Sequence, residues 1–321
     1  MQLSRYTTFT DEQYSVFIRT YIFPVIAIAL FLGFWSVSAQ QVQTSLGQLP
    51  GPAAVFEQAA NLVDEHIAER DKETGFYQRQ EIRNAAKLEK NPDATIKVRS
   101  YTGKPTFIDQ IFTSLKTVFT GFILASLIAI PIGIITGLSN DLYRSINPIV
   151  QLLKPVSPLA WLPIVTMVVS AVYVSDDPMF DKSYLTSALV VTLCCMWPTL
   201  INTAVGVSSV DKDLINVSKV LSLGWFTKVY KIILPSSVPM IFTGLRLSLS
   251  IGWMVLIAAE MLAQNPGLGK FVWDEFQNGS SNSLGRIMVA VVAIGIIGFM
   301  LDRLMLLLQQ KVSWDKSVLL R

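Results

Sequence analysis

The sequence predicts an all-α integral membrane protein with six transmembrane helices. Hydrophobic residues make up 51% of the 321-residue chain, charged residues make up only 15%, and several long runs carry no charge at all. A soluble domain usually has about 25% charged residues. A helix needs about 20 apolar residues to cross a bilayer core of about 30 Å. The charge is therefore missing from segments long enough to span a membrane.

Six apolar segments are candidates for these spans. Four of them contain no charged residue: residues 20–56, 117–140, 155–175 and 183–210. The fifth, residues 232–259, contains only Arg246, and the sixth, 287–301, reaches spanning length only if its helix continues past Asp302. The first run is longer than the apolar core of a signal peptide, so we expect a retained helix over 19–39.

Basic residues in the short loops predict the orientation, because cytoplasmic loops carry an excess of Lys and Arg. Three segments have this excess over the short loops opposite them: residues 141–154, 211–231 and the tail after residue 302. We therefore expect both tails, 1–18 and 311–321, to be cytoplasmic. Residues 40–106 also carry nine basic residues, but a loop of this length translocates largely regardless of charge, so we expect it outside.

The outer segment, residues 40–106, is expected to contain one amphipathic helix. Its apolar residues recur with helical period between Leu49 and Arg70: Val55, Phe56, Ala59, Leu62, Val63 and Ile67. Pro52 suits the first turn, and the helix is predicted to lie on the outer membrane surface or against the bundle. Residues 70–100 are charged and contain Asn91-Pro92, which predicts an exposed loop or small appendage. It is either a docking surface for an external partner or a solvated insertion.

Prolines and polar residues within the spans indicate a translocation path. Bent backbone at Pro131, Pro155, Pro158, Pro163 and Pro198 should face protein or water, because lipid cannot satisfy it. Hydroxyl, amide and free backbone N–H groups can bind an anion. The candidate donors lie at helical spacing on the second and fourth spans or at the broken third span: Thr117, Thr120, Ser157, Trp161, Thr199, Asn202 and Thr203. Hydrogen bonding between helices is the alternative interpretation.

Two ionisable residues lie within the fifth span. Arg246 is either part of the path or an anchor near the cytoplasmic end. Glu260 follows fourteen residues later, about 21 Å along a helix, so the two should not pair. We expect Glu260 to be structural and hydrogen-bonded, because an unpaired carboxylate would repel an anion.

Several chemistries are excluded by the sequence. His66 is the only histidine, so we expect no zinc or haem site. Cys194 and Cys195 are adjacent and point in different directions on a helix, so they should not form a disulfide. There is no GxxxxGK[ST] phosphate loop, no nucleophile–base set and no nucleic-acid signature. The chain is therefore not expected to be an enzyme, to hydrolyse ATP itself or to hold a cofactor or metal.

A basic, amphipathic segment separates the fourth and fifth apolar runs. Its sequence predicts a first helix with Leu214, Val217 and Leu221 on one face, a break at Ser222-Leu223-Gly224, and a second short helix. The apolar face of the second helix contains Trp225, Val229, Ile232 and Ile233. Two such helices in an L shape form a projecting knob, which suits a groove on another protein.

This segment resembles the coupling loop of type I permeases of binding-protein-dependent ABC importers. Their pattern is Glu-Ala-Ala, three residues, Gly, nine residues, Ile, one residue and Leu-Pro, with spacing that this chain keeps. The corresponding and adjacent residues are Asn216, Val217, Ser218, Leu221, Ser222, Gly224, Ile232, Leu234 and Pro235. Four further segments are similar to the nitrate, bicarbonate, sulfonate and taurine group: LPGP (49–52), KPVSPLAWLPI (154–164), WPTLINTAVGV (197–207) and IAAEML (257–262).

The resemblance implies a type I permease fold over 107–310, with coupling loop 211–239, in a bacterial inner membrane. It implies a homodimer, cytoplasmic ATPase subunits that hold ATP-Mg, and a periplasmic or lipid-anchored solute-binding protein. Nitrate or nitrite is the first candidate substrate, and bicarbonate, taurine, alkanesulfonate and cyanate are the alternatives. A secondary transporter is less favoured, because the sequence shows neither an internal repeat nor an intramembrane charge relay.

Overall fold

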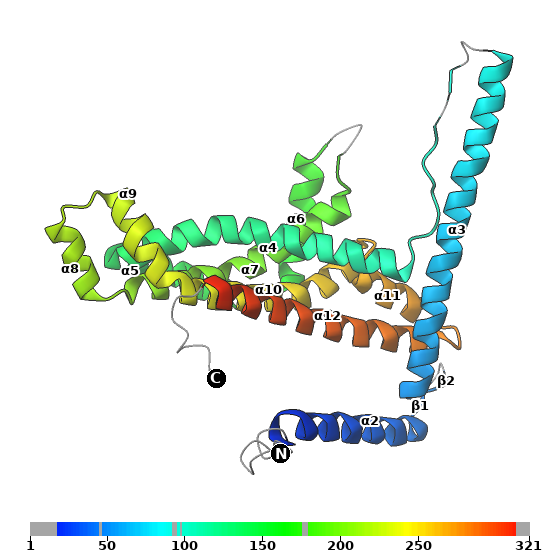
Figure 1. The fold of residues 1–321 in the computed structure, drawn as a ribbon, viewed down its shortest axis with the longest axis horizontal. Helices are drawn as coiled ribbons and strands as arrows, with labels where there is room; N and C mark the ends of the chain where they lie inside the picture. Colours follow the sequence, from blue (N-terminus) through cyan, green and yellow to red (C-terminus); the bar gives the residue numbers. More distant parts are fainter. Residues whose placement is uncertain (1–17, 45–46, 92–94, 97, 175–178, 313–321) are drawn as a thin grey trace, which may run out of the picture. The chain divides into compact units, whose positions relative to one another are not determined.

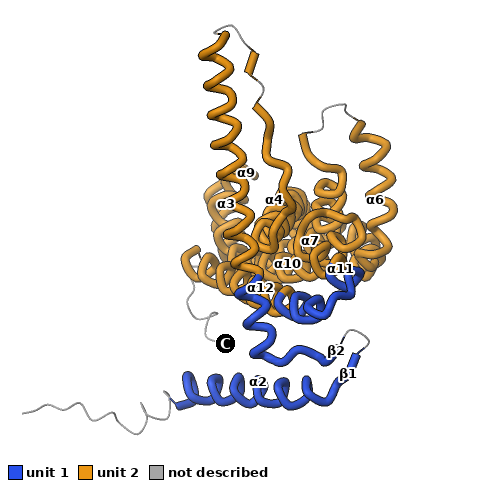
Figure 2. Tube along the Cα trace, turned by 90° about the vertical axis from the view of Figure 1, so that its right-hand side faces the viewer, with its two compact units in different colours: residues 1–61, 275–289 blue, residues 62–274, 290–321 orange. Residues whose placement is uncertain are grey.

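The computed structural model describes residues 18–44, 47–91, 95–96, 98–174 and 179–312 (Figure 1). The predicted tails, 1–18 and 311–321, lie almost wholly outside the described residues. The chain forms two compact units (Figure 2). The first unit comprises residues 1–61 and 275–289, and the second comprises residues 62–274 and 290–321.

The first unit contains the predicted first span. A π-helical turn, η1 (Ile18–Ile22), leads into α2 (Phe23–Gln41), which confirms the helix expected over 19–39. Its apolar side chains are almost all exposed, as suits a helix surrounded by lipid. Two short antiparallel strands, β1 (Gln43–Thr44) and β2 (Gly47–Gln48), then turn the chain toward the start of α3.

The second unit contains most of the helical bundle. Its long apolar helices are α4 (Phe107–Leu138), α7 (Lys182–Ser208), α10 (Leu234–Ala263) and α12 (Ser283–Val312), the last of which begins in the first unit. Helix α12 continues past Asp302 as predicted. The predicted third span, 155–175, contains the shorter α6 (Pro158–Val172), and the predicted loop 141–154 forms a further helix, α5 (Asn140–Leu153), bent by 98° from α6. The described residues thus hold five spanning-length helices, or six when the bent pair counts as one span.

Glycine residues let α7 pack closely against α4 and α10. A Cβ atom added at Gly133 of α4 would lie 2.7 Å from Thr203 Cβ and 2.9 Å from the carbonyl oxygen of Leu200, both on α7. A Cβ atom at Gly252 of α10 would collide with Cys195 Sγ, also on α7. Small residues bring membrane helices together in this way, because contact between backbones replaces the hydrophobic driving force available in water.

Gly133→Ala should therefore destabilise the bundle by about 1–3 kcal/mol, the usual range for overpacking a core. Gly295→Ala on α12 is the matched control, because its Cβ would meet no atom within 4 Å. The control should be neutral or slightly stabilising, since Ala forms helices better than Gly. Thermal unfolding in detergent measures both, and equal melting temperatures would contradict close packing at Gly133.

Helix α3 (Pro52–Lys90) is longer than the sequence analysis predicts. It begins at Pro52 as expected, but it continues through residues 70–90, where a loop or appendage was expected. The loop prediction is wrong there because Glu, Lys, Arg, Gln and Ala are good helix formers even where apolar residues are few. The residues of the predicted apolar stripe also differ in burial: Val55 and Leu62 are buried, whereas Phe56, Val63 and Ile67 are exposed.

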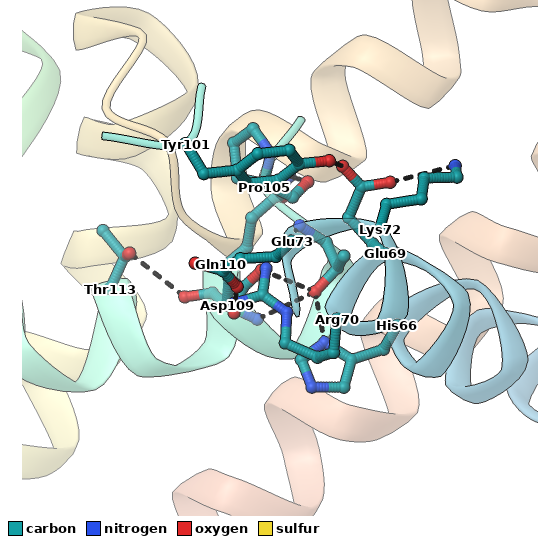
Figure 3. A network of polar contacts seen from close by, with 11 residues as sticks. His66, Glu69, Arg70, Lys72, Glu73, Tyr101, Pro105, Asp109, Gln110 and Thr113 are labelled. Atoms are coloured by element: carbon teal, nitrogen blue, oxygen red, sulfur yellow. Dashed lines mark hydrogen bonds and ion pairs between the residues drawn. The ribbon is translucent and has the colours of Figure 1, made fainter. Parts of the chain in front are cut away.

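Residues 62–90 of α3 and the returning residues 98–106 form an outer arm, which side-chain hydrogen bonds hold together. The Gln80 amide donates to the Arg99 carbonyl oxygen (3.2 Å) and accepts from the Arg99 N–H (2.8 Å). Tyr101 Oη donates to Glu69 Oε1 at 2.6 Å (Figure 3). At the base of the arm, Arg70 Nη2 lies 3.1 Å from Asp109 Oδ2 in the first turn of α4. The arm is therefore tied to the bundle.

The pair of Tyr101 and Glu69 makes the arm sensitive to pH. Its hydrogen bond lowers the pKa of Glu69 and raises that of Tyr101. The Glu69 contribution to stability is present above the ordinary pKa of a glutamate and is lost as the pH falls through the lower, folded value. The Tyr101 contribution is present below about pH 10 and is lost as the pH rises through the raised value.

Tyr101→Phe should remove this dependence. Hydrogen exchange of the arm should be slower in the parent than in the variant near neutral pH. The ratio of the two protection factors should approach one as the pH falls through the folded pKa of Glu69. A ratio that stayed constant across this range would contradict the coupling.

Candidate functional site

The loop at 211–239 folds as one short helix followed by a continuous long one. Helix α8 (Lys212–Val220) begins at Asp211, whose carboxylate accepts from the Asp213 N–H at 2.9 Å. After the turn, α9 (Trp225–Lys228), the π-helical η2 (Val229–Ile233) and α10 follow without a gap. The first predicted short helix is confirmed. The second is not separate, because it continues directly into the fifth span.

The turn between α8 and α9 places an unusual backbone angle at Ser222. Its φ is +48°, a left-handed conformation that favours glycine, whereas Gly224 has an ordinary φ of −59°. Ser222 is the residue aligned with the glycine of the importer pattern, so the backbone keeps the glycine conformation even though the residue differs.

Ser222→Gly should stabilise this turn by about 0.5–1 kcal/mol, because glycine adopts a positive φ without a steric cost. Ser222→Val should destabilise it, since a β-branched residue is a strong outlier there. Protease resistance of the 211–239 segment in detergent would rank the three proteins. A ranking with Gly below Ser would contradict the left-handed turn.

The inner side of the loop packs on the ends of the spans. Val207, Val210 and Ile233 are buried in one cluster, and Ile215 of α8 packs against it. The predicted apolar residues of α8 point elsewhere, because Leu214, Val217 and Leu221 are exposed. Helical period alone could not show which apolar face was turned inward.

The outer side of the loop is apolar and exposed. Val220 is 84% exposed and Phe226 is 81% exposed, and the Trp225 and Phe226 rings touch edge-on with centroids 4.9 Å apart. We call this surface the apolar corner, and its members are Leu214, Val217, Val220, Leu221, Trp225, Phe226 and Tyr230. A group of exposed large apolar side chains such as this usually marks a contact with another molecule.

Ser218, by contrast, lies on the inner side of α8. It is 2% exposed, and its hydroxyl donates to the Ile215 carbonyl oxygen at 2.6 Å. An acidic residue at Ser218 would disturb folding, so a test of the apolar corner belongs at exposed positions. Of the other pattern residues, Asn216 is exposed and Ile232 is partly buried against the inner cluster. Leu234 and Pro235 begin α10.

The candidate path residues of the second and fourth spans are largely engaged within the bundle. Thr117 and Thr199 are buried, and Thr199 Oγ1 lies 2.7 Å from the Ser248 hydroxyl on α10. Thr203 is also buried, beside Gly133, and its hydroxyl has no hydrogen-bond partner among the described residues. The contact of Thr199 fits the interpretation as a hydrogen bond between helices, whereas Thr203 makes none to any residue that the structure describes.

Thr120 and Asn202 are only partly buried. Thr120 Oγ1 lies 2.7 Å from Tyr184 Oη on α7, and the Asn202 amide donates to the Pro198 carbonyl oxygen at 2.8 Å. Lys116 was not predicted as a site residue, but its Nζ lies 5.2 Å from the centre of the Tyr184 ring. It directly precedes the uncharged run 117–140, so counting the span from that run left it outside, although α4 begins nine residues earlier, at Phe107.

The broken third span does not offer free amides at the expected positions. Ser157 is the N-cap of α6, and its hydroxyl accepts from the Leu159 N–H at 3.3 Å. The N–H groups of Ala160 and Trp161 donate to the Ser157 carbonyl oxygen at 2.9 and 3.3 Å. The Trp161 N–H is therefore not the free backbone donor that was predicted, because the new helix satisfies it locally.

Arg246 is paired with an acidic residue of the last span. Its Nη2 donates to Asp302 Oδ2 at 2.8 Å, and its Nε donates to the other oxygen at 2.5 Å. This two-point geometry is the strongest form of the arginine–carboxylate contact. It links α10 to α12, as an anchor does. Arg246 and Glu260 do not pair, as predicted.

Glu260 is fully buried and accepts several hydrogen bonds. The Ser114 hydroxyl lies 2.9 and 2.8 Å from its two oxygens, and the Gly269 N–H donates to Oε2 at 3.0 Å. Gly269 is in the first turn of α11 (Leu268–Asn278), so the carboxylate caps that helix. The Asn265 amide adds a contact of 3.4 Å. These contacts confirm the expected structural hydrogen-bonding role.

Within the described ranges, no group of three or more His, Cys, Asp or Glu side chains is placed to hold a metal ion. Cys194 and Cys195 are both free thiols.

Membrane-length helices packed through glycines, with a projecting loop, define a multi-spanning membrane protein of the transporter class. The chain belongs to the family of binding-protein-dependent transport system inner membrane components, whose model matches residues 129–314. It is therefore the permease component of such a system and not an enzyme.

Relatives support this assignment. The nitrate import permease protein NrtB of Synechococcus elongatus is 36% identical over 204 residues, which cover 64% of this chain and 69% of that protein. NrtB of Leptolyngbya laminosa is 35% identical over 208 residues, covering 65% and 70% of the two chains. The bicarbonate transport system permease protein CmpB of Synechococcus elongatus is 36% identical over 202 residues, covering 63% and 68%.

A solved structure of the MetNI methionine ABC transporter in an inward-facing conformation has the same fold. The TM-score is 0.55 at 13% identity, and the match covers 64% of this chain and 95% of that chain. This similarity confirms the predicted type I ABC importer permease fold.

Proposed function

We propose that this chain is the membrane-spanning subunit of an ATP-driven importer for a small inorganic anion, with nitrate as the first candidate. The observation that carries this proposal is the similarity to nitrate import permeases, which covers 64% of the chain in the case of Synechococcus elongatus NrtB. Bicarbonate is the second candidate, because a bicarbonate permease is equally similar, at 36% identity.

The apolar corner would be the contact with the ATPase. Two copies of the chain form the translocation unit, and each apolar corner sits in a groove of a cytoplasmic ATPase that binds ATP-Mg. Closure of the ATPase subunits moves the corners together and switches the access of the path. To change the ratio of the two access states from 1:99 to 99:1, ATP binding must favour one state over the other by about 5.5 kcal/mol.

This arrangement places both termini in the cytoplasm and residues 40–106 outside the inner membrane. An external solute-binding protein delivers the anion. Selectivity then rests largely with that protein, because the hydroxyls of Thr117 and Thr199 are buried and hydrogen-bonded within the bundle. Selectivity that stayed unchanged after exchange for a sulfonate-specific binding protein would contradict this division of roles.

The test is copurification of the chain with the ATPase encoded beside it, followed by ATP hydrolysis assays. The complex, with its cognate solute-binding protein, is supplied with nitrate, bicarbonate or taurine in turn. Stimulation by nitrate alone supports the first candidate, and stimulation by another anion replaces it. Failure to form any complex with an ATPase would overturn the importer role.

A further inference from the structure

The outer arm carries a row of positive charge that neither the fold nor the proposed transport cycle uses. Its members, which we call the basic stripe, are Arg79, Arg83, Lys87 and Lys90 of α3. All four side chains are exposed. Within the part of the chain that the structure describes, none of them forms an ion pair. Helix α3 also lies before residues 129–314, the part that matches the family model.

Charged side chains are arranged differently in the two halves of the arm. In the inner half, opposite charges pair along the helix, as in Arg70 with Glu73 (2.7 Å) and Lys72 with Glu69 (3.1 Å). In the outer half, Arg79 and Arg83 are four residues apart, and so are Arg83 and Lys87. Like charges at this spacing repel each other and weaken a helix. The stripe therefore does not help the arm to fold, whereas an acidic partner would neutralise it.

The stripe points away from the bundle. Arg70 marks the side of α3 that faces α4, since it bonds Asp109 in the first turn of that helix. Arg79 follows nine residues later, which is about two and a half helical turns, so it projects from the opposite side. Arg83 and Lys90 fall close to the same line. The hydrogen bonds of Gln80 to Arg99 hold the helix in this rotation.

We propose that the basic stripe is a docking surface for an acidic face of the external solute-binding protein. This inference rests on the proposed function, which places the arm outside the membrane. The stripe faces away from α4, which is long and apolar enough to lie in lipid, and this direction favours a water-soluble partner. Electrostatic complementarity of this kind speeds and orients encounter.

The test compares two variants with the same net charge. Arg79→Gln/Arg83→Gln removes two positive charges from the stripe. Gln78→Glu/Ala85→Glu adds two negative charges at exposed positions on another side of the same helix. The full chain with its ATPase, in lipid nanodiscs, is titrated with the cognate solute-binding protein loaded with nitrate. The first variant should bind about tenfold more weakly and the second within about twofold of the parent.

The difference between the variants should shrink at high salt, since screening weakens exposed charges. Equal affinities for the two variants would overturn the proposal. So would a first variant whose affinity for the binding protein is unchanged while the full-chain complex loses binding to vesicles containing anionic lipid, which would assign the stripe to lipid headgroups. If nitrate stimulates the parent complex and both variants bind the solute-binding protein as tightly as the parent does, only the role of the stripe is refuted. A parent that neither binds the protein nor responds to any anion refutes the importer role and the stripe with it.

Discussion

Val220→Asp and Phe226→Asp are each expected to abolish copurification of this chain with its ATPase and, with it, ATP-driven transport. Both side chains project from the apolar corner, where they are 84% and 81% exposed. Burying an unpaired carboxylate in the groove of a partner costs about 3 kcal/mol or more, and 1.4 kcal/mol corresponds to a tenfold loss of affinity. The association should therefore weaken by more than about 100-fold.

The matched control is Val98→Asp in the outer arm. Val98 is 76% exposed, so the same change is made at a similar exposure far from the loop in the sequence. All three variants should keep the melting temperature of the parent in detergent, because no buried contact is removed. ATPase binding by Val220→Asp at the level of the control would contradict the role of the apolar corner.

Glu260→Ala is expected to destabilise the bundle by about 3 kcal/mol. The carboxylate accepts from the Ser114 hydroxyl and the Gly269 N–H in a fully buried position. Hydrogen bonds to a charged group are worth about 1.5–3 kcal/mol each, and its removal leaves buried donors unsatisfied. Glu260 also joins α4, α10 and α11, so its loss should loosen three helices together.

Thermal unfolding in detergent measures this effect, with Glu89→Ala as the control. Glu89 is exposed at the tip of α3, and such surface changes usually stay within about 0.5 kcal/mol. Gly269→Ala should disturb the same contact, because the added Cβ would collide with the Ile257 carbonyl oxygen. If Glu260→Ala and Glu89→Ala melted alike, the carboxylate would not be the link between these helices.

The sequence predicted the spans well because membrane insertion depends on a local property, the length of an apolar run. It also predicted the break in the third span from Pro155 and Pro158, and the structure bends there by 98°. The loop after the fourth span was found from its Leu234-Pro235 signature and its spacing. Each of these features depends on residues that lie within a few tens of positions of one another in the sequence.

The helix of the outer arm was not predicted from the sequence beyond residue 70. Residues 70–90 contain few large apolar side chains, and low hydrophobicity suggested a loop. Their Lys, Glu, Gln and Ala content favours helix, and contacts with distant residues, such as that of Glu69 with Tyr101, 32 positions away, hold the helix in place. Helix propensity was visible in the sequence, whereas those contacts were not.

What the sequence by itself determined is therefore the class of protein, the places of five of the six predicted spans and the position of the projecting loop. The tertiary structure decided which partner each buried polar group has: Asp302 for Arg246, and Ser114 with Gly269 for Glu260. It also decided that Ile215 points inward and that Val220 and Phe226 point outward. The physical reason is that an apolar stripe or a lone charge specifies a need for burial or pairing, and only the packing of distant helices selects what meets that need.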